Sequence, residues 1–326
     1  MIYHLFQLLK DYDIPGQGLM SYLSFRAMLA SVTAMLISFF AGRRIIRWLQ
    51  KKQIGETIRD LGLEGQMQKK GTPTMGGVII ILAITVPVLL FCDLTNIYTQ
   101  LLLLTTLWCG GIGFADDYIK VFKHNKEGMS ERGKLILQIL LGLIVGLTVC
   151  FNNDIVVREK VNVAEASNGT TYLPQGSSGL DVDSETIVSS SGWKMENIVK
   201  STKTTIPFVK DHEFDYKWLS PFQGAWGWYC KWAIYLLMIV IVITACSNGT
   251  NLTDGMDGLA AGSSAIVGIV IGIIAWLSGN LINSNYLNIM YIPGSGEVAV
   301  FMSIFVGALF GFLWYNSYPA QVFMGD

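Results

Sequence analysis

Apolar residues fill seven long stretches of the chain, and most polar residues lie in the segments between them. A helix that crosses a bilayer needs about 20 mostly apolar residues, and these stretches approach or reach that length. They are residues 20–41, 75–92, 99–114, 135–151, 232–246, 259–277 and 298–314. The pattern predicts an all-α protein, a polytopic membrane helix bundle with seven spans. The first stretch is expected to remain as an anchor, because it is too long for a signal peptide.

The composition supports the same class of protein. Hydrophobic residues make up 52% of the 326 residues and charged residues only 14%, whereas soluble domains carry about 25% charged residues. The net charge of -1 disfavours a nucleic-acid partner, which requires a basic surface. The five cysteines lie in or beside apolar stretches without metal-binding spacing, and we expect them to be free thiols.

Lysines and arginines are concentrated between the first and second spans and between the third and fourth. These two segments contain Arg43, Arg44, Arg47, Lys51, Lys52, Arg59, Lys69 and Lys70, and Lys120, Lys123, Lys126, Arg132 and Lys134. Short cytoplasmic loops carry the excess of positive charge in membrane proteins. We therefore expect both segments to be cytoplasmic and the N-terminus to lie outside. Arg26, near the outer end of the first span, is expected to snorkel to the headgroups.

One long segment is polar. Residues 152–229 are rich in Ser, Thr, Asn and Gly, and the parity of the spans makes them a long extracytoplasmic loop. We expect a short strand at 204–209, an aromatic interfacial segment at 216–232 and flexibility in the serine-rich part. The chain is thus divided into spans one to four (1–151), this loop (152–229) and spans five to seven (230–326).

Five aspartates fall on the same predicted side of the membrane. Asp116 and Asp117 are at the cytoplasmic end of span three, Asp254 and Asp257 lie between spans five and six, and Asp326 follows span seven. Adjacent carboxylates ionise together only where a cation compensates them, and oxygen ligands without histidine or thiolate suit Mg²⁺ or Mn²⁺. A pair of aspartates after a helix is often only a solvated cap. Acidic groups at three ends of one membrane face nevertheless favour a functional site.

Basic residues and glycines flank these aspartates. Lys69, Lys120 and Lys134 would supply charge to phosphate oxygens, and the glycines at 76, 77, 255 and 258 permit close approach of the backbone to a ligand. Taken singly, basic loops usually set only topology, and glycines are common in membrane bundles. Their combination with the aspartates favours a phosphate-bearing substrate.

Most of the aspartates, lysines and glycines just described fall within four sequence motifs. These are KKGTPTMGG at 69–77, DDYIK at 116–120, NLTDGMDGLA at 251–260 and NSYPAQVFMGD at 316–326. In these motifs and their order the chain resembles the phospho-N-acetylmuramoyl-pentapeptide transferase family, which belongs to the polyprenyl-phosphate N-acetylhexosamine-1-phosphate transferases. The resemblance extends from about residue 18 to the last residue, apart from the extracytoplasmic loop.

The resemblance implies an enzyme of the bacterial cytoplasmic (inner) membrane that performs the first membrane step of peptidoglycan synthesis. The family transfers phospho-MurNAc-pentapeptide from UDP-MurNAc-pentapeptide to undecaprenyl phosphate, which yields lipid I and UMP, with Mg²⁺ as cofactor. Such a transfer needs neutralised charge and in-line placement more than a strong base. The resemblance also implies a membrane lipid as partner and a homodimer as an option.

Roles for single residues follow from the same resemblance. The catalytic candidates are Asp116, Asp117, Asp254 and Asp326, of which Asp326 and Asp254 are the metal candidates. Asp116 would take a proton from undecaprenyl phosphate or position it, and Asp117 would assist or bind metal. The substrate-binding candidates are Lys69, Thr74, Lys120, Lys134, Asn251, Gly255, Met256, Asp257, Asn316 and Phe323. A covalent phospho-enzyme on one aspartate is the alternative to direct attack.

The chain departs from the family in two respects. The family has ten spans and a histidine-bearing cytoplasmic loop after span eight, whereas seven spans are present here. We therefore expect a truncated chain that is inactive by itself, which lipid I synthesis by the purified chain would contradict. The extracytoplasmic loop is also larger than is usual in the family.

Two rival functions remain at this point. A UDP-GlcNAc:polyprenyl-phosphate GlcNAc-1-phosphate transferase shares the acidic motifs but is less similar to the segments at 72–77 and 316–325. A cation-coupled membrane carrier would place its acidic residues at mid-span in broken helices, whereas the aspartates here gather at one face.

Overall fold

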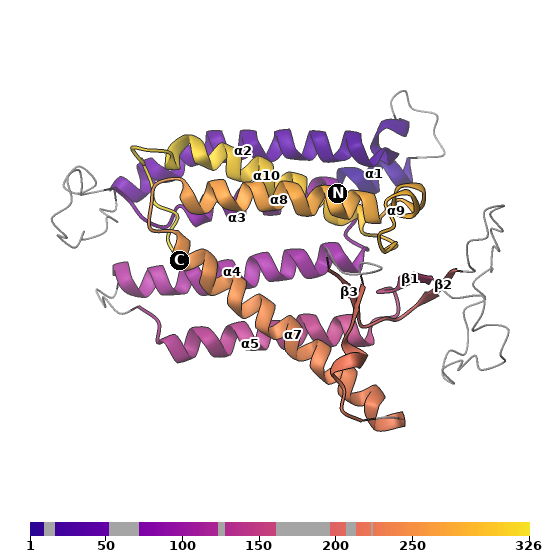
Figure 1. Cartoon of the computed structure of the whole chain (residues 1–326). Coiled ribbons are helices and arrows are strands. Elements are labelled where there is room, and N and C mark those ends of the chain that lie inside the picture. The colour runs from indigo at the N-terminus through magenta and orange to yellow at the C-terminus, as the bar shows by residue number, and fades with distance from the viewer. Residues whose placement is uncertain (10–16, 52–71, 123–127, 161–195, 207–212, 223) are drawn as a thin grey trace.

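The computed structural model describes residues 1–9, 17–51, 72–122, 128–160, 196–206, 213–222 and 224–326. Its long helices are α2 (Leu23–Lys51), α3 (Gly77–Phe91), α4 (Ile97–Phe122), α5 (Glu131–Phe151), α7 (Gly224–Thr253), α8 (Leu259–Ser278) and α10 (Gly296–Asn316). Each predicted span coincides with one of them (Figure 1). Six are long and apolar enough to cross a membrane, and α3 is a shorter apolar helix of 15 residues. The predicted all-α, polytopic membrane fold is confirmed.

The shorter elements gather at one end of the helices. Near the N-terminus these are α1 (Ile2–Leu8) and η1 (Gln17–Ser21), and the others are β1 (Val157–Lys160), β2 (Glu196–Val199), β3 (Lys203–Thr205), β4 (Glu213–Asp215), η4 (Tyr216–Leu219) and α9 (Leu281–Tyr286). The strands form two antiparallel pairs, β1 with β2 and β3 with β4. The strand predicted at 204–209 is present as β3 in its first part. Its remainder, and the serine-rich stretch expected to be flexible, lie mainly outside the described residues.

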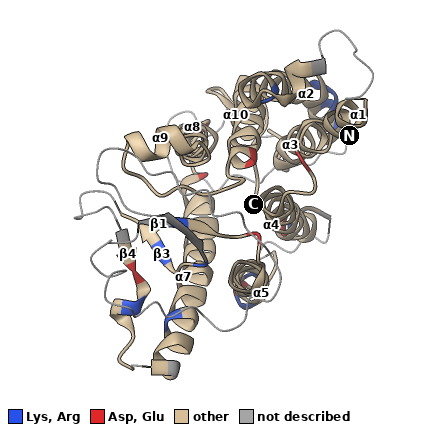
Figure 2. Ribbon diagram, turned by 90° about the vertical axis from the view of Figure 1, so that its right-hand side faces the viewer, with Lys and Arg blue, Asp and Glu red and all other residues tan. Residues whose placement is uncertain are grey.

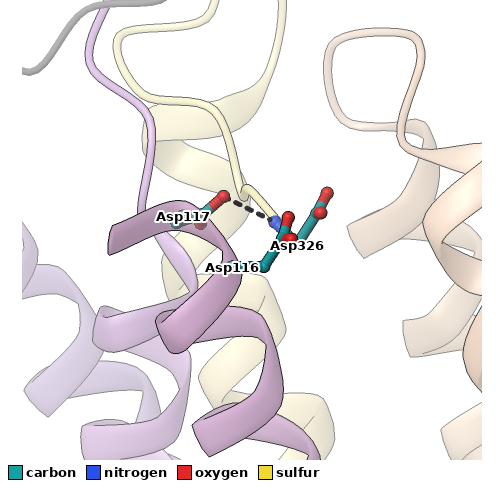
Figure 3. Close-up of side chains that lie close together, drawn as sticks. All are labelled: Asp116, Asp117 and Asp326. Carbon is teal, nitrogen blue, oxygen red and sulfur yellow. Dashed lines mark hydrogen bonds between the residues drawn. The ribbon is translucent and has the colours of Figure 1, made fainter. Parts of the chain in front are cut away.

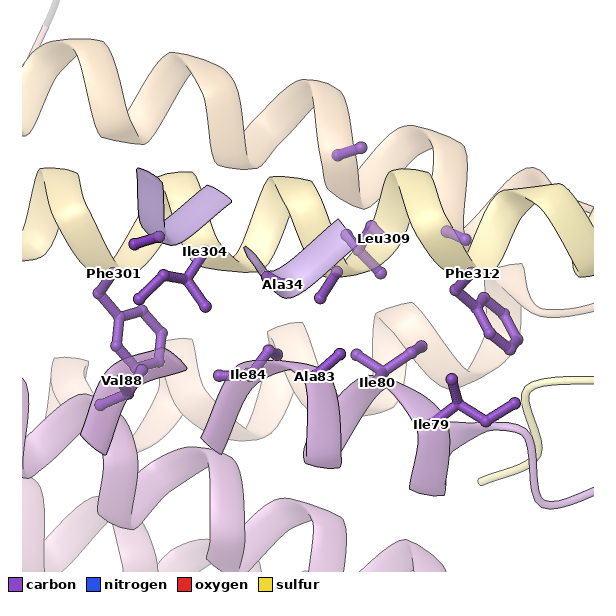
Figure 4. Packing of buried hydrophobic residues seen from close by; sticks show 14 of the residues in the cluster. Ala34, Ile79, Ile80, Ala83, Ile84, Val88, Phe301, Ile304, Leu309 and Phe312 are labelled. Carbon is purple, nitrogen blue, oxygen red and sulfur yellow. The ribbon is translucent and has the colours of Figure 1, made fainter. Parts of the chain in front are cut away.

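The buried core lies between α3 and α10, with α2 and α8 against α10. Figure 4 shows Phe301 of α10 facing Val88 of α3, and Ile304 pointing toward Ile84. At the other end of the contact, Phe312 lies toward Ile79. The sequence of α3, GVIIILAITVPVLLF, has no polar face, which is typical of a helix surrounded by others. This packing fixes where α3 begins, and therefore where the segment that precedes it meets the end of α10.

Two glycines of α10 bring its backbone close to α2. A Cβ atom at Gly307 would overlap the carbonyl oxygen of Ser31, and one at Gly311 would lie 2.6 Å from the carbonyl oxygen of Met35. Glycines four residues apart allow such close approach of membrane helices, whose association depends on packing. The close contact between α2 and α10 therefore requires glycine at both positions.

Helix α7 differs in direction from the other long helices. It crosses α5 obliquely in Figure 1 and runs across the end-on view of its neighbours in Figure 2. None of the residues in its most apolar window is buried. Its packing partner is mainly α5, so the position of α7 depends on that one contact.

The expectation for Arg26 is wrong. Its side chain does not reach outward but is 4% exposed and forms an ion pair with Glu297 of α10. The ring of Tyr3 lies over the guanidinium group, 4.3 Å from ring centroid to Cζ, and Glu297 also accepts a hydrogen bond from the N–H of Asp93 at 2.9 Å. An acidic partner on the neighbouring helix compensates the charge, so the side chain does not need the headgroups.

The close contact of α2 and α10 yields a test of the fold. We expect Gly307→Ala to lower the free energy of unfolding by about 1–3 kcal/mol, because the new methyl group forces the helices apart. Gly262→Ala in α8 is the matched control, since a Cβ there meets no atom within 4 Å and alanine favours a helix by up to about 1 kcal/mol over glycine. Denaturation in detergent micelles measures both, and equal effects would contradict the predicted overlap.

Candidate active site

The last residues of the chain lie against the segment that precedes α3. The N–H of Phe323 donates to the carbonyl of Pro73 at 2.9 Å, and the N–H of Gly76 donates to the carbonyl of Phe323 at 2.9 Å. A further bond joins the N–H of Gly77 to the carbonyl of Met324 at 2.8 Å. These bonds resemble the pairing of two short strands, and they direct Asp326 toward α4.

Two glycines provide the space for Asp326. A Cβ at Gly113 of α4 would overlap the main-chain carbonyl of Asp326, and a Cβ at Gly325 would overlap the carboxylate of Asp117. Gly325 also has φ of 79°, a conformation that other residues rarely adopt. The backbone of Asp326 therefore rests on α4, and its N–H donates to Oδ1 of Asp117 at 3.4 Å (Figure 3).

Asp116, Asp117 and Asp326 form an acidic cluster in which one carboxylate oxygen of each lies within 4.8 Å of the others. Figure 3 shows that two come from adjacent positions on α4 and the third from the end of the chain. Asp116 and Asp117, predicted at the cytoplasmic end of span three, lie within α4, and this helix continues past them to Phe122. The helix continues because the residues after Asp117 include neither glycine nor proline. Asp116 is 0% exposed as a result.

Two lysines compensate this cluster. Nζ of Lys120 lies 2.6 Å from Oδ2 of Asp116 and 2.7 Å from Oδ2 of Asp326. Nζ of Lys134, on α5, lies 2.9 Å and 2.8 Å from the same two atoms. Oδ1 of Asp116 accepts a hydrogen bond from the N–H of Met129 at 2.7 Å. The lysines thus separate two carboxylates that would otherwise repel each other.

The carboxylate of Asp326 is held in its ionised form. Burial raises its pKa, but the contacts with the ammonium groups of Lys120 and Lys134 outweigh burial, and the net result is a pKa well below the usual value. Both lysine side chains keep partial exposure, 35% for Lys120 and 21% for Lys134. The two lysine side chains therefore lie at the edge of the cluster and not in its interior.

The donor set of the acidic cluster fits a hard divalent cation. Its three carboxylates offer only oxygen, and their spacing permits one ion to contact all three. Asp254, which the sequence predicted as a metal ligand beside Asp326, is not part of this group. It lies in the turn after α7, half-buried.

The turn between α7 and α8 is tied to the same end of the bundle through Asn316. Oδ1 of Asn316 accepts from the N–H of Gly258 at 3.1 Å, and its Nδ2 donates to the carbonyl of Val322 at 2.9 Å. Asp257 accepts a hydrogen bond from the N–H of Ala320 at 3.2 Å. A pocket of about 550 Å³ lies here, lined by Met256, Asp257, Gly258, Leu259, Leu313, Ser317 and Tyr318.

The remaining predicted site residues occupy varied environments. Asn251, in the last turn of α7, and Gly255 and Met256, in the turn that follows, are exposed, whereas Thr74 and Phe323 are partly buried. Asn316 is 2% exposed and uses its amide for backbone hydrogen bonds. Lys69 lies outside the described residues.

Gly113 and Gly325 are two functional positions that the sequence pattern does not reveal. Gly325 stands inside the last motif, but a glycine that precedes an aspartate carries no signal of its own. Only the contact between the chain end and α4 reveals why both positions lack a side chain.

Comparison with known proteins gives consistent matches. The glycosyl transferase family 4 profile matches residues 196–326, and the phospho-N-acetylmuramoyl-pentapeptide-transferase signature 1 matches residues 69–81. The chain is 50% identical over its whole length to the phospho-N-acetylmuramoyl-pentapeptide-transferase of Parabacteroides distasonis, of which it covers 73%. It is 51% identical to the protein of that name from Flavobacterium psychrophilum, with 76% of that protein covered. The corresponding protein of Bacteroides fragilis is 47% identical, with 73% covered.

The ion pairs of Asp116 yield a prediction. Asp116→Asn removes the charge that holds both lysines, and we expect the free energy of unfolding to fall by about 1–3 kcal/mol. Asp154→Asn, at an exposed position after α5, is the matched control and should stay within about 0.5 kcal/mol of the unchanged chain. Denaturation at neutral pH measures both, and a loss for Asp116→Asn no larger than that of the control would contradict the charge compensation described above.

Proposed function

Because the chain belongs to the phospho-N-acetylmuramoyl-pentapeptide-transferase family, we propose that it catalyses the formation of lipid I at the membrane. It is a transferase with a nucleotide-sugar substrate and a membrane lipid acceptor. In the reaction that we assign to it, phospho-MurNAc-pentapeptide passes from UDP-MurNAc-pentapeptide to undecaprenyl phosphate. The products are lipid I, an intermediate of peptidoglycan synthesis, and UMP.

The transfer is one exchange of bonds at phosphorus. An oxygen of undecaprenyl phosphate attacks the phosphorus that carries MurNAc, and the bond from that phosphorus to the bridging oxygen of the diphosphate breaks. UMP leaves with the bridging oxygen and its electron pair. Two anions must approach each other in this step, so compensation of charge and in-line placement matter more than a strong base.

The observation that carries the proposal is the group of three carboxylates and two ammonium groups at one end of the bundle. Lys120 and Lys134 are partly exposed, and we propose that they contact the phosphate oxygens of the substrates. Asp116 takes a proton from the acceptor phosphate or positions it, and Asp117 assists or binds metal. The contacts of Asp116 with both lysines support the positioning role.

Mg²⁺ is the cofactor that this donor set fits. We propose that Asp326 holds it together with Asp117, and that Asp254 contributes from the turn after α7. When bound, Mg²⁺ supplies neutralisation of the negative charge on the diphosphate. The N–H of Asp326 contacts Asp117 directly, so these two of the three proposed ligands keep their relative position without the ion.

We assign the nucleotide of the substrate to the turn between α7 and α8. Met256 and Asp257 line the pocket beside α8 and α10, and Gly255 and Asn251 stand next to them in the chain. Phe323, whose backbone is fixed by its bonds to Pro73 and Gly76, stacks on the uracil ring in this proposal. Asn316 supports the pocket by holding Gly258 and Val322 together, although a direct contact of Asn316 with substrate stays a prediction.

The acidic cluster is proposed to face the cytoplasm of a bacterium, at its inner membrane. Arg43, Arg44, Arg47 and Lys51 lie in the last part of α2, and Gly42 packs against Tyr315 near the end of α10. This basic stretch is therefore at the same end of the bundle as the cluster, which supports the orientation by the positive-inside rule. Homodimer formation stays a prediction.

Substrate choice can be tested by binding. Titration of the detergent-solubilised chain in the presence of Mg²⁺ should show UDP-MurNAc-pentapeptide binding at least about tenfold more tightly than UDP-GlcNAc, which corresponds to about 1.4 kcal/mol. Competition by UMP would show that the nucleotide site is the one occupied. Equal or tighter binding of UDP-GlcNAc would favour the GlcNAc-1-phosphate transferase, and uptake of a cation into vesicles without nucleotide binding would favour a carrier.

The proposed metal ligands can be tested by measuring metal binding directly, without an activity assay. Titration with Mn²⁺, followed by its electron paramagnetic resonance signal, should give a dissociation constant at least about tenfold higher for Asp326→Asn than for the unchanged chain. Asp154→Asn is again the control and should bind Mn²⁺ normally. Unchanged affinity in Asp326→Asn would remove this residue from the proposed ligands.

A further inference from the structure

Helix α7 packs apolar side chains against two glycines of α5. A Cβ atom at Gly142 would lie 2.9 Å from the Cα of Val240, and one at Gly146 would overlap the side chain of Leu236. The two helices therefore approach each other closely at this point. Apolar contacts have no preferred direction, so a hydrogen bond adds information about the register of the two helices.

Gln138 of α5 and Asn248 of α7 form a reciprocal amide pair beyond these glycines. Nδ2 of Asn248 donates to Oε1 of Gln138 at 2.9 Å, and Nε2 of Gln138 donates to Oδ1 of Asn248 at 3.3 Å and to Oγ of Ser247 at 3.0 Å. The side chain of Gln138 is buried, at 5% exposure. A buried amide without partners is costly, so this pair favours one register of α7 on α5.

The pair stands between the two parts of the proposed site. On α5, Gln138 is one helical turn after Lys134, which contacts Asp116 and Asp326. On α7, Asn248 lies in the last two turns, shortly before Asn251 and the turn that bears Asp254. Because α7 packs mainly on α5, the amide pair is a directional contact close to both parts.

We propose that Gln138 and Asn248 are positioning residues for the transfer: they set the distance between the nucleotide-binding turn after α7 and the group formed by the acidic cluster and its two lysines. This inference rests on the function proposed above. Neither amide touches the reacting atoms. The pair acts by fixing the end of α7, and a displacement of about 1 Å at a reacting centre costs up to about a hundredfold in rate.

The test combines two readouts on the full chain in detergent. Gln138→Ala and Asn248→Ala should each speed hydrogen exchange in peptides from 247–258 and raise the dissociation constant for UDP-MurNAc-pentapeptide about tenfold, and the double variant should add little. The exchanged pair, Gln138→Asn with Asn248→Gln, keeps two amides of the same total length and should restore most of the affinity. Because Asn248 is exposed, Asn248→Ala should fold normally.

Gln100→Ala is the matched control. Nε2 of Gln100 donates to the carbonyl of Leu94 at 2.9 Å at the far end of α4, so its loss should leave exchange at 247–258 and nucleotide affinity unchanged. Normal exchange and normal affinity in Gln138→Ala would overturn the positioning role alone. Failure of the unchanged chain to bind UDP-MurNAc-pentapeptide would instead contradict the proposed function. In that case, faster hydrogen exchange at 247–258 in Gln138→Ala would still show that the amide pair holds the end of α7 in place.

Discussion

Four short contacts between two ammonium groups and two carboxylates hold the functional end of this bundle together. Lys120 and Lys134 each bridge Asp116 and Asp326, and they thereby join α4, α5 and the end of the chain. Without them, three carboxylates within 4.8 Å would repel one another. The same contacts fix the two ammonium groups that we propose to bind the substrate phosphates. Stability and proposed chemistry thus use the same charges, so a change in either is expected to alter the other.

The opposite end of the bundle is fastened by a second pair of charges. Arg26 and Glu297 join α2 to α10, and Glu297 also holds the backbone at Asp93 after α3. Between the two ends, the contacts of α3 and α10 are almost wholly apolar (Figure 4). Buried ion pairs specify register more reliably than they add stability, and here they occur where apolar packing alone would leave the helices free to slide.

Hydropathy was sufficient to locate the seven long helices, six of which are long and apolar enough to cross a membrane, because each is a continuous apolar run that needs no knowledge of its neighbours. It was insufficient for helix ends: polar Asp116 and Asp117 lie within α4, which continues to Phe122 because no glycine or proline follows them in the helix. Which carboxylates meet could not be predicted either, since the meeting of Asp326 with α4 depends on the missing side chain of Gly113. The environment of the Arg26 side chain was predicted wrongly because its partner, Glu297, lies 271 positions away in the sequence.

The oblique course of α7 has a consequence for the membrane around it. Its 30 residues make a helix about 45 Å long, whereas the hydrocarbon core is about 30 Å thick. A helix of that length either inclines or extends past the hydrocarbon core, and Figure 1 shows α7 inclined relative to its neighbours. Inclination of a membrane helix responds to the thickness of the surrounding lipid. A change of lipid is therefore expected to shift the last turn of α7, which carries Asn251 and precedes the turn that we propose to bind the nucleotide.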